Sequence, residues 1–205
     1  MHNWVKWLRR IPVFGVYLRY LNLYVGKGEL RYFNRAAPLD LWLERFLVEV
    51  VSCFLVTGII WILIVYLDQL DGVGLQGLVL SVFPSLLGFG IGVFALIFVL
   101  PDELMNELDR GQKKSGLGSH MMISDMAYPL VFLALAIMLS VILGLLLSSP
   151  VADFVELFLF VYGLTLVFDL IGVIAASALA SRTNKVRKVG NQRRRDLLAK
   201  LRRKL

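Results

Sequence analysis

Cysteine and histidine are nearly absent from this chain. It has one cysteine, Cys53, and two histidines, His2 and His120. A single cysteine excludes an internal disulfide, a CxxC redox pair and a structural zinc cluster. Two histidines, one terminal and one in a predicted loop, leave little for a histidine metal site or a Ser-His-Asp triad. We therefore expect no enzyme, no metal and no cofactor.

Lysine and arginine are missing from two long stretches, between Arg45 and Arg110 and between Lys114 and Arg182. The 205 residues are 58 % hydrophobic, with a mean hydropathy of +0.73. Because about 20 apolar residues cross a bilayer as a helix, the chain is expected to be an integral membrane protein. We predict an all-α four-helix bundle of two hairpins, with spans at about 46–67, 78–100, 127–147 and 153–180.

The basic residues also predict the topology. Eight precede the first span, three lie in the central loop and eleven follow the fourth span. The positive-inside rule then places both termini and the loop 101–126 in the cytoplasm. Residues 68–77 and 148–152 become short turns on the opposite side.

Residues 1–45 form a basic, aromatic segment without the uninterrupted apolar core of a signal peptide. Two interpretations stay open. The segment forms one or two helices in the membrane interface, with tryptophan and tyrosine at headgroup depth, or it packs on its own helical bundle. After it, Pro38 ends any preceding helix, and Asp40 is expected to cap the helix that follows.

An acid lies deep in the fourth span. Asp169 is sixteen residues beyond Asp153, and helical spacing places Tyr162 and Thr165 on its face. Either Asp169 lines an ion or proton path, or it is protonated and bonds a neighbouring helix.

The first span carries a second polar stripe, on which Glu49, Cys53 and Thr57 repeat every four residues. Glu49 is then a second acid of a pathway, or it reaches the interface or pairs with Arg45 across one turn. The predicted topology brings Glu49 and Asp169 into the same half of the membrane.

Small residues recur in two other spans and predict close helix contacts. Gly88 and Gly92 form a G-x-x-x-G motif in the second span, where Pro84 is expected to bend or to start the helix. Ser140 and Gly144 repeat at fourfold spacing in the third span. One bundle does not need all of these contacts, so a closed homo-oligomer is expected.

The cytoplasmic segments carry charge of both signs. Pro101 predicts a short acidic helix over 101–110. The tail, residues 181–205, reads as a basic amphipathic helix that binds anionic lipid headgroups or a partner. The sequence offers no aromatic platform or groove-reading fold, which argues against nucleic acid. The tail's expected binding residues are Arg193, Arg194, Arg195, Arg202 and Arg203.

Three function classes follow. The first is a membrane sensor or scaffold that contacts a cytosolic protein, the second is a channel or proton-coupled transporter using Asp169, and the third is an enzyme on lipid phosphates with magnesium at Asp102 and Glu103. The third lacks an acid pair at ligand spacing within a span. The layout and the passage PSLLGFGIGVFALIFVLPDELMNEL resemble small four-span membrane proteins of bacterial phage-defence systems, such as the membrane component of the Kiwa system. That resemblance implies an inner-membrane homo-oligomer that detects infection and works with a cytosolic effector.

Overall fold

The fold is taken from a computed structural model of the chain. It describes residues 12–67, 74–96, 99, 105, 119–146 and 149–202, and side chains within these ranges from residue 13 to residue 179. The chain divides into two compact units, residues 1–170 and residues 171–205. The described residues are helical apart from short turns and contain no strand.

Four helical stretches are long and apolar enough to cross a membrane, as the sequence predicted: Leu39–Tyr66, Leu75–Leu96, Ser119–Leu146 and Pro150–Leu179. Their boundaries differ from the predicted ones. The largest difference is at the third span, because residues 119–126 were expected to be loop and are the first two turns of a helix. The predicted short helix over 101–110 lies outside the described residues, apart from residue 105.

The first span is assembled from three helical pieces. Helix α4 (Leu39–Leu41) leads into the π-helix η1 (Trp42–Leu47), which continues as α5 (Val48–Tyr66). Pro38 stands at the N-cap position, and Asp40 lies inside the first turn without capping it. The predicted capping role of Asp40 is therefore wrong, since a residue within the first turn has passed the cap position.

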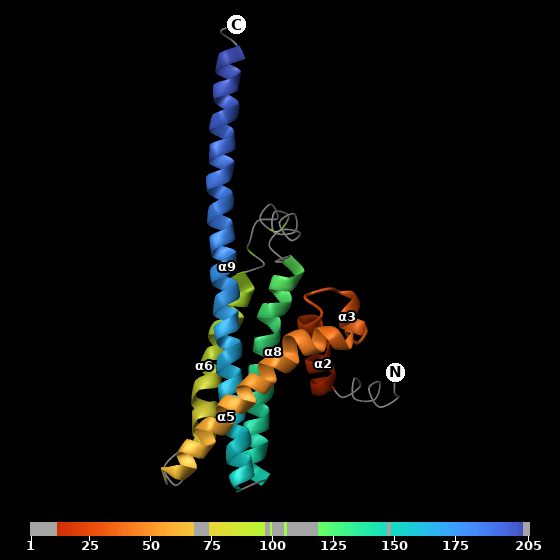
Figure 1. Cartoon of the computed structure of the whole chain (residues 1–205), viewed down its shortest axis with the longest axis vertical. Coiled ribbons are helices and arrows are strands. Elements are labelled where there is room, and N and C mark those ends of the chain that lie inside the picture. Colours follow the sequence, from red (N-terminus) through yellow and green to blue (C-terminus); the bar gives the residue numbers. More distant parts are fainter. Residues whose placement is uncertain are drawn as a thin grey trace. The chain divides into compact units, whose positions relative to one another are not determined.

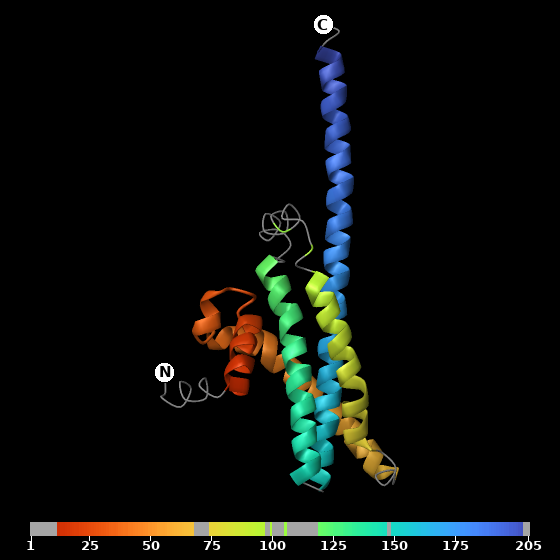
Figure 2. The same cartoon turned by 180° about the vertical axis from the view of Figure 1, so that it is seen from behind.

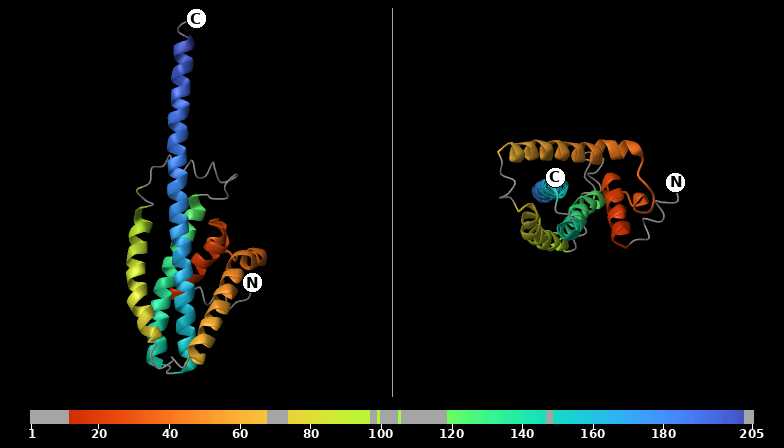
Figure 3. Two further views of the ribbon diagram at one scale, coloured as in Figure 1. Left: turned by 60° about the vertical axis from the view of Figure 1, so that its left-hand side comes forward. Right: turned by 90° about the horizontal axis from the view of Figure 1, so that it is seen from below.

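Helix α9 (Pro150–Arg202) packs against three other helices through the residues of its first half that belong to the first unit. Phe154 lies edge-on to Phe54 and Trp61 of α5, and Phe160 stacks on Phe83 of α6 (Leu75–Leu96). Tyr162 meets α8 (Ser119–Leu146) through a hydrogen bond and an edge-on ring contact. Residues 150–170 of α9 thus lie between α5 on one side and α6 with α8 on the other (Figures 1 and 3).

Two glycines allow these helices to approach closely. A Cβ on Gly163 of α9 would collide with the ring of Phe83, and a Cβ on Gly90 of α6 would collide with Leu130 of α8. Both positions need the absence of a side chain for packing. Pro84 lies inside α6, so it does not start that helix.

Helix α2 (Pro12–Val25) packs against α8, on the side away from α6 (Figure 2). Leu21, Tyr24 and Val25 are buried in this contact. The N-terminal segment thus packs on the bundle over residues 12–25, and residues 1–11 lie outside the described residues. The short helix α3 (Arg31–Asn34) follows α2.

The turn between α2 and α3 is fixed by backbone contact. Lys27 and Gly28 have positive φ values of 53° and 79°, and the Gly28 amide donates to the Leu23 carbonyl at 2.9 Å. A Cβ at Gly28 would collide with the backbone of His120 at the start of α8. Only glycine combines this backbone conformation with this close approach.

The second unit consists of the remainder of α9, which is helical as far as Arg202. The predicted tail residues Arg193, Arg194, Arg195 and Arg202 lie on this helix, and Arg203 lies outside the described residues.

Candidate functional site

A cluster of ionisable side chains joins the N-terminal helices to the bundle. We call it the Arg45 cluster, and its members come from α2, η1, α5, α8 and α9: Tyr24, Arg45, Glu49, Asp125 and Asp169. All of them belong to the first unit of the chain.

An ion pair holds the cluster together. Nη2 of Arg45 lies 2.7 Å from Oδ2 of Asp125, and the two side chains are only 18 % and 7 % exposed. The other oxygen of Asp125 accepts a hydrogen bond from Ser124 at 3.3 Å. Breaking such a buried pair is costly, because the remaining charge stays in a poorly solvated place.

Tyr24 contacts both charged sides of the cluster. The guanidinium of Arg45 lies 4.3 Å from the centre of the Tyr24 ring and donates to the Tyr24 carbonyl at 2.9 Å. The Tyr24 hydroxyl donates to Oε2 of Glu49 at 3.1 Å. Burial raises the pKa of Tyr24, and the negative charge of Glu49 raises that pKa further. Tyr24 therefore remains a phenol and a hydrogen-bond donor at neutral pH.

Glu49 and Asp169 form an acidic pair. Asp169 acts electrostatically on Glu49, and also on Tyr24 and Asp125. Oε1 of Glu49 is buried and accepts no hydrogen bond from the described residues. Arg45 forms its ion pair with Asp125, and its charge also acts on Glu49. Of the interpretations left open for Glu49, the ion pair with Arg45 across one turn is not found among the described residues.

A row of hydroxyl groups lies next to this acidic pair. The Tyr128 hydroxyl lies 3.3 Å from that of Tyr17 and 3.0 Å from that of Tyr162. Nearby, the thiol of Cys53 donates to Thr165 at 3.4 Å. Burial raises the pKa of Tyr17, against a smaller opposing effect of its hydrogen bond to Tyr128. The row therefore consists of neutral groups that donate and accept hydrogen bonds.

A second polar site lies where α9 begins. We call it the Glu156 pocket, a cavity of about 260 Å³ lined by Gln76, Leu143, Gly144, Ser149, Ala152, Asp153 and Glu156. Ser140 donates to Oε2 of Glu156 at 2.8 Å, and Oε1 of Glu156 is buried without a partner among the described residues. Gln76 donates to the Ser140 carbonyl at 3.3 Å.

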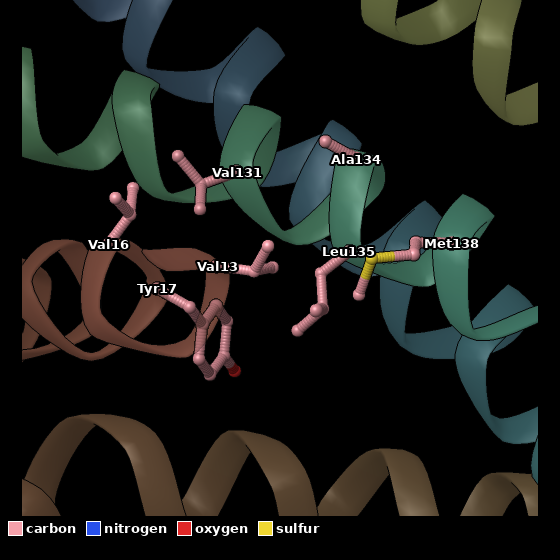
Figure 4. Close-up of a pocket in the computed structure, with 7 residues that line it drawn as sticks. All are labelled: Val13, Val16, Tyr17, Val131, Ala134, Leu135 and Met138. Atoms are coloured by element: carbon pink, nitrogen blue, oxygen red, sulfur yellow. The ribbon is translucent and has the colours of Figure 1, made fainter. Parts of the chain in front are cut away.

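An apolar groove of about 480 Å³ lies between α2 and α8. Figure 4 shows Val13 of α2 and Leu135 of α8 extending into it. Tyr17 lines this groove and also begins the hydroxyl row, so the groove and the polar interior share one side chain. The remaining lining residues are Val16, Val131, Ala134 and Met138.

The polar residues singled out from the sequence come together in part. Tyr162 and Thr57 are buried, and Thr165 contacts Cys53 as a polar interhelical neighbour. Thr57 bonds only the carbonyl of Cys53 on its own helix. The side chain of Asp169 is exposed, although the sequence predicted a buried acid. Asp169 lies one residue before the end of the first unit.

The small residues singled out from the sequence divide into two groups. Ser140 is buried, and Gly144 lies against the side chain of Gln76. A Cβ on Gly88 or Gly92 would meet nothing within 4 Å, so these glycines make no helix contact within the described chain. Gly90, on the opposite side of α6, makes that contact instead.

Three site residues were not singled out from the sequence: Tyr24, Asp125 and Glu156. Arg45 was considered as a partner of Glu49. Asp125 was assigned to a loop, and its partner lies 80 positions earlier in the chain. Glu156 did carry a signal, because it is an acid inside an apolar run that starts at Phe154.

The chain matches no protein-family profile, no curated protein and no solved structure.

Proposed function

We propose that this chain is a multi-pass membrane sensor that passes a change in the membrane or envelope to a cytosolic protein. The observation that carries the proposal is the buried ion pair between Arg45 and Asp125, with Tyr24 of α2 packed against it. A charged contact of this kind has two discrete arrangements, paired and solvated, and so supplies the bistable element that a switch needs. Helix α2 is docked in one arrangement and released in the other.

The proposed topology follows the distribution of lysine and arginine. Both termini and the loop 101–126 are cytoplasmic, and the four spans form two hairpins in the bacterial inner membrane. The resemblance to phage-defence membrane proteins supports detection of infection as the signal. The basic tail beyond residue 181 then binds anionic headgroups or the cytosolic partner.

Release of α2 is expected when the ion pair is removed. Spin labels at Phe14→Cys and Val141→Cys, two exposed positions on α2 and α8, report the distance between these helices in a Cys53→Ser background. In lipid nanodiscs the parent protein should give one narrow distance distribution. Arg45→Gln should broaden and lengthen it, because the uncompensated Asp125 draws in water and separates the helices.

The matched control is Arg31→Gln, which removes an exposed ion pair with Glu29 and should leave the distance unchanged.

The parent protein should also acquire a population with α2 released from α8 when membrane potential or anionic lipid content is changed. A single distance that neither Arg45→Gln nor any membrane condition alters would eliminate the switch.

Homo-oligomerisation is part of the proposal, and one face of α6 supports it. Five small residues on this face are exposed in the single chain: Ser81, Ser85, Gly88, Gly92 and Ala95. In lipid, close packing of small residues replaces the hydrophobic effect as the driving force for helix association. A second copy of α6 is the expected partner of this face.

Substituting Gly88 and Gly92 together with leucine is expected to convert the oligomer to monomer, because the added side chains hold the two backbones apart. Cross-linking and mass photometry in nanodiscs measure the subunit number. Leucine at Ser140 serves as the contrasting variant, since that position is buried within the chain and its effect is on folding. An oligomer unchanged by the double substitution would rule out this face.

A second candidate function is a proton pathway through the bundle. The specific observation in its favour is the acidic pair of Glu49 and Asp169 beside the hydroxyl row of Tyr17, Tyr128 and Tyr162. Carboxyl groups that exchange one proton, next to neutral hydroxyls that relay hydrogen bonds, are the parts of a proton relay. Proton flux into liposomes that contain the purified protein tests this candidate.

A further inference from the structure

We propose that the Glu156 pocket binds a calcium ion. The pocket is separate from the Arg45 cluster. The member of that cluster on α9 is Asp169, which follows Glu156 by thirteen residues, or about 20 Å of helix rise. Its oxygen-bearing lining residues come from the start of α6, the turn before α9 and the first two turns of α9.

The carboxyl group of Glu156 is the centre of the site. The residue is 3 % exposed, and Oε2 accepts the hydroxyl of Ser140 at 2.8 Å. Oε1 is buried and has no hydrogen-bond partner among the described residues, and the Glu156 side chain is part of the cavity lining. A buried carboxylate oxygen without a donor costs free energy unless a cation or a proton satisfies it.

The lining is rich in oxygen and lacks positive charge. Asp153 lies one turn before Glu156 and adds a second, exposed carboxylate that acts electrostatically on it. Gln76 uses its amide nitrogen for the Ser140 carbonyl, which leaves the amide oxygen as a ligand. No lysine or arginine occurs anywhere in 75–96, 119–146 or 150–179, so the three helices around the pocket cannot neutralise these two acids with a basic side chain.

Calcium fits this arrangement better than other common cations. Two carboxylates balance a double positive charge, and carboxylate, amide and hydroxyl oxygens are the ligands that calcium prefers. The cavity of about 260 Å³ has room for several waters at ~30 Å³ each, which complete a coordination shell of six to eight oxygens. Magnesium demands a tighter octahedral site, and zinc prefers nitrogen and sulfur.

The test is calcium titration of the purified full-length protein in nanodiscs by isothermal calorimetry. The wild type should bind one calcium ion per chain with a dissociation constant of about 10⁻⁴ to 10⁻³ M, the range of sites with few charged ligands. Glu156→Gln and Asp153→Asn should each weaken binding at least ~tenfold, because each removes one of the two charges. Asp153 is exposed, so its amide variant keeps the fold and provides the result if Glu156→Gln does not fold.

Asp40→Asn is the matched control, because it removes an exposed acid in a first helical turn outside the pocket and should bind calcium as the wild type does. The proposal is overturned by absence of binding to the wild type at 10 mM calcium, roughly ten times the weakest expected constant. It is also overturned by wild-type affinity in both pocket variants, or by equal affinity for magnesium. None of these outcomes bears on the spin-label or flux experiments, because their test substitutions, Arg45→Gln and Asp169→Asn, lie outside the Glu156 pocket.

Discussion

Replacing Asp125 with asparagine is expected to lower the free energy of unfolding by about 3–5 kcal/mol, the cost of leaving one member of a buried ion pair without its partner. Arg45 would keep its charge and its contact with the Tyr24 ring, yet it would lose the carboxylate 2.7 Å from its Nη2 atom. Reversible unfolding in mixed micelles of lipid and detergent measures the effect. Glu29→Gln, which removes the partner of Arg31 in an exposed pair, should cost less than about 1 kcal/mol.

A double variant separates the ion pair from the rest of the contact. With Arg45→Met and Asp125→Leu combined, no charge is left unpaired, and most of the lost stability should return. Arg45→Met alone, Asp125→Leu alone and the double variant form a double-mutant cycle with the wild type. The coupling energy from this cycle measures the interaction between the two side chains. A coupling near zero would mean that the pair does not join the N-terminal helices to the bundle, and the proposed switch would lose its physical basis.

Replacing Asp169 with asparagine is expected to abolish proton flux, if the second candidate function holds. Asparagine keeps the shape of the side chain, but its amide cannot bind and release a proton as a carboxyl group does. Glu49→Gln should have the same effect, and the double variant should be no worse than either single one, because the two carboxyl groups act as a unit. The measurement is the fluorescence of a pH-sensitive dye inside liposomes on which a potassium diffusion potential is imposed.

Asp40→Asn is again the control, since it removes an exposed acid outside the acidic pair. Flux that survives in both pair variants would show that the pathway runs elsewhere or through leaks. Silence of the wild type at every pH and voltage would exclude constitutive conduction through the acidic pair.

The four spans could be predicted because hydropathy and the gaps between basic residues are local properties of the sequence. The start of the third span was missed for a physical reason. Residues 119–126 include Ser124 and Asp125, which look like loop residues when solvent is their only partner. In the folded chain Arg45 neutralises Asp125, and the helix extends through it.

Part of the candidate site could be predicted, because an acidic residue inside an apolar span can be recognised from the sequence alone. Asp169 and Glu49 were found in this way, and the structure brings them together. Their partners could not be found, because Tyr24 and Asp125 come from distant parts of the chain whose docking depends on tertiary packing. Gly88 and Gly92 show the reverse case, since a contact motif in the sequence does not specify which helix it contacts, or whether that helix belongs to the same chain.

The contact between Gly28 and the backbone of His120 has a consequence for how this architecture would evolve. Main-chain atoms are the same in every residue, so this contact does not depend on which side chain stands at position 120. Side chains at the start of α8 can therefore vary without loss of this one contact, whereas position 28 must remain glycine. A glycine after α2, followed by an arginine in the first turns of the first span and an aspartate early in the third, is therefore a better criterion for recognising distant relatives than overall identity.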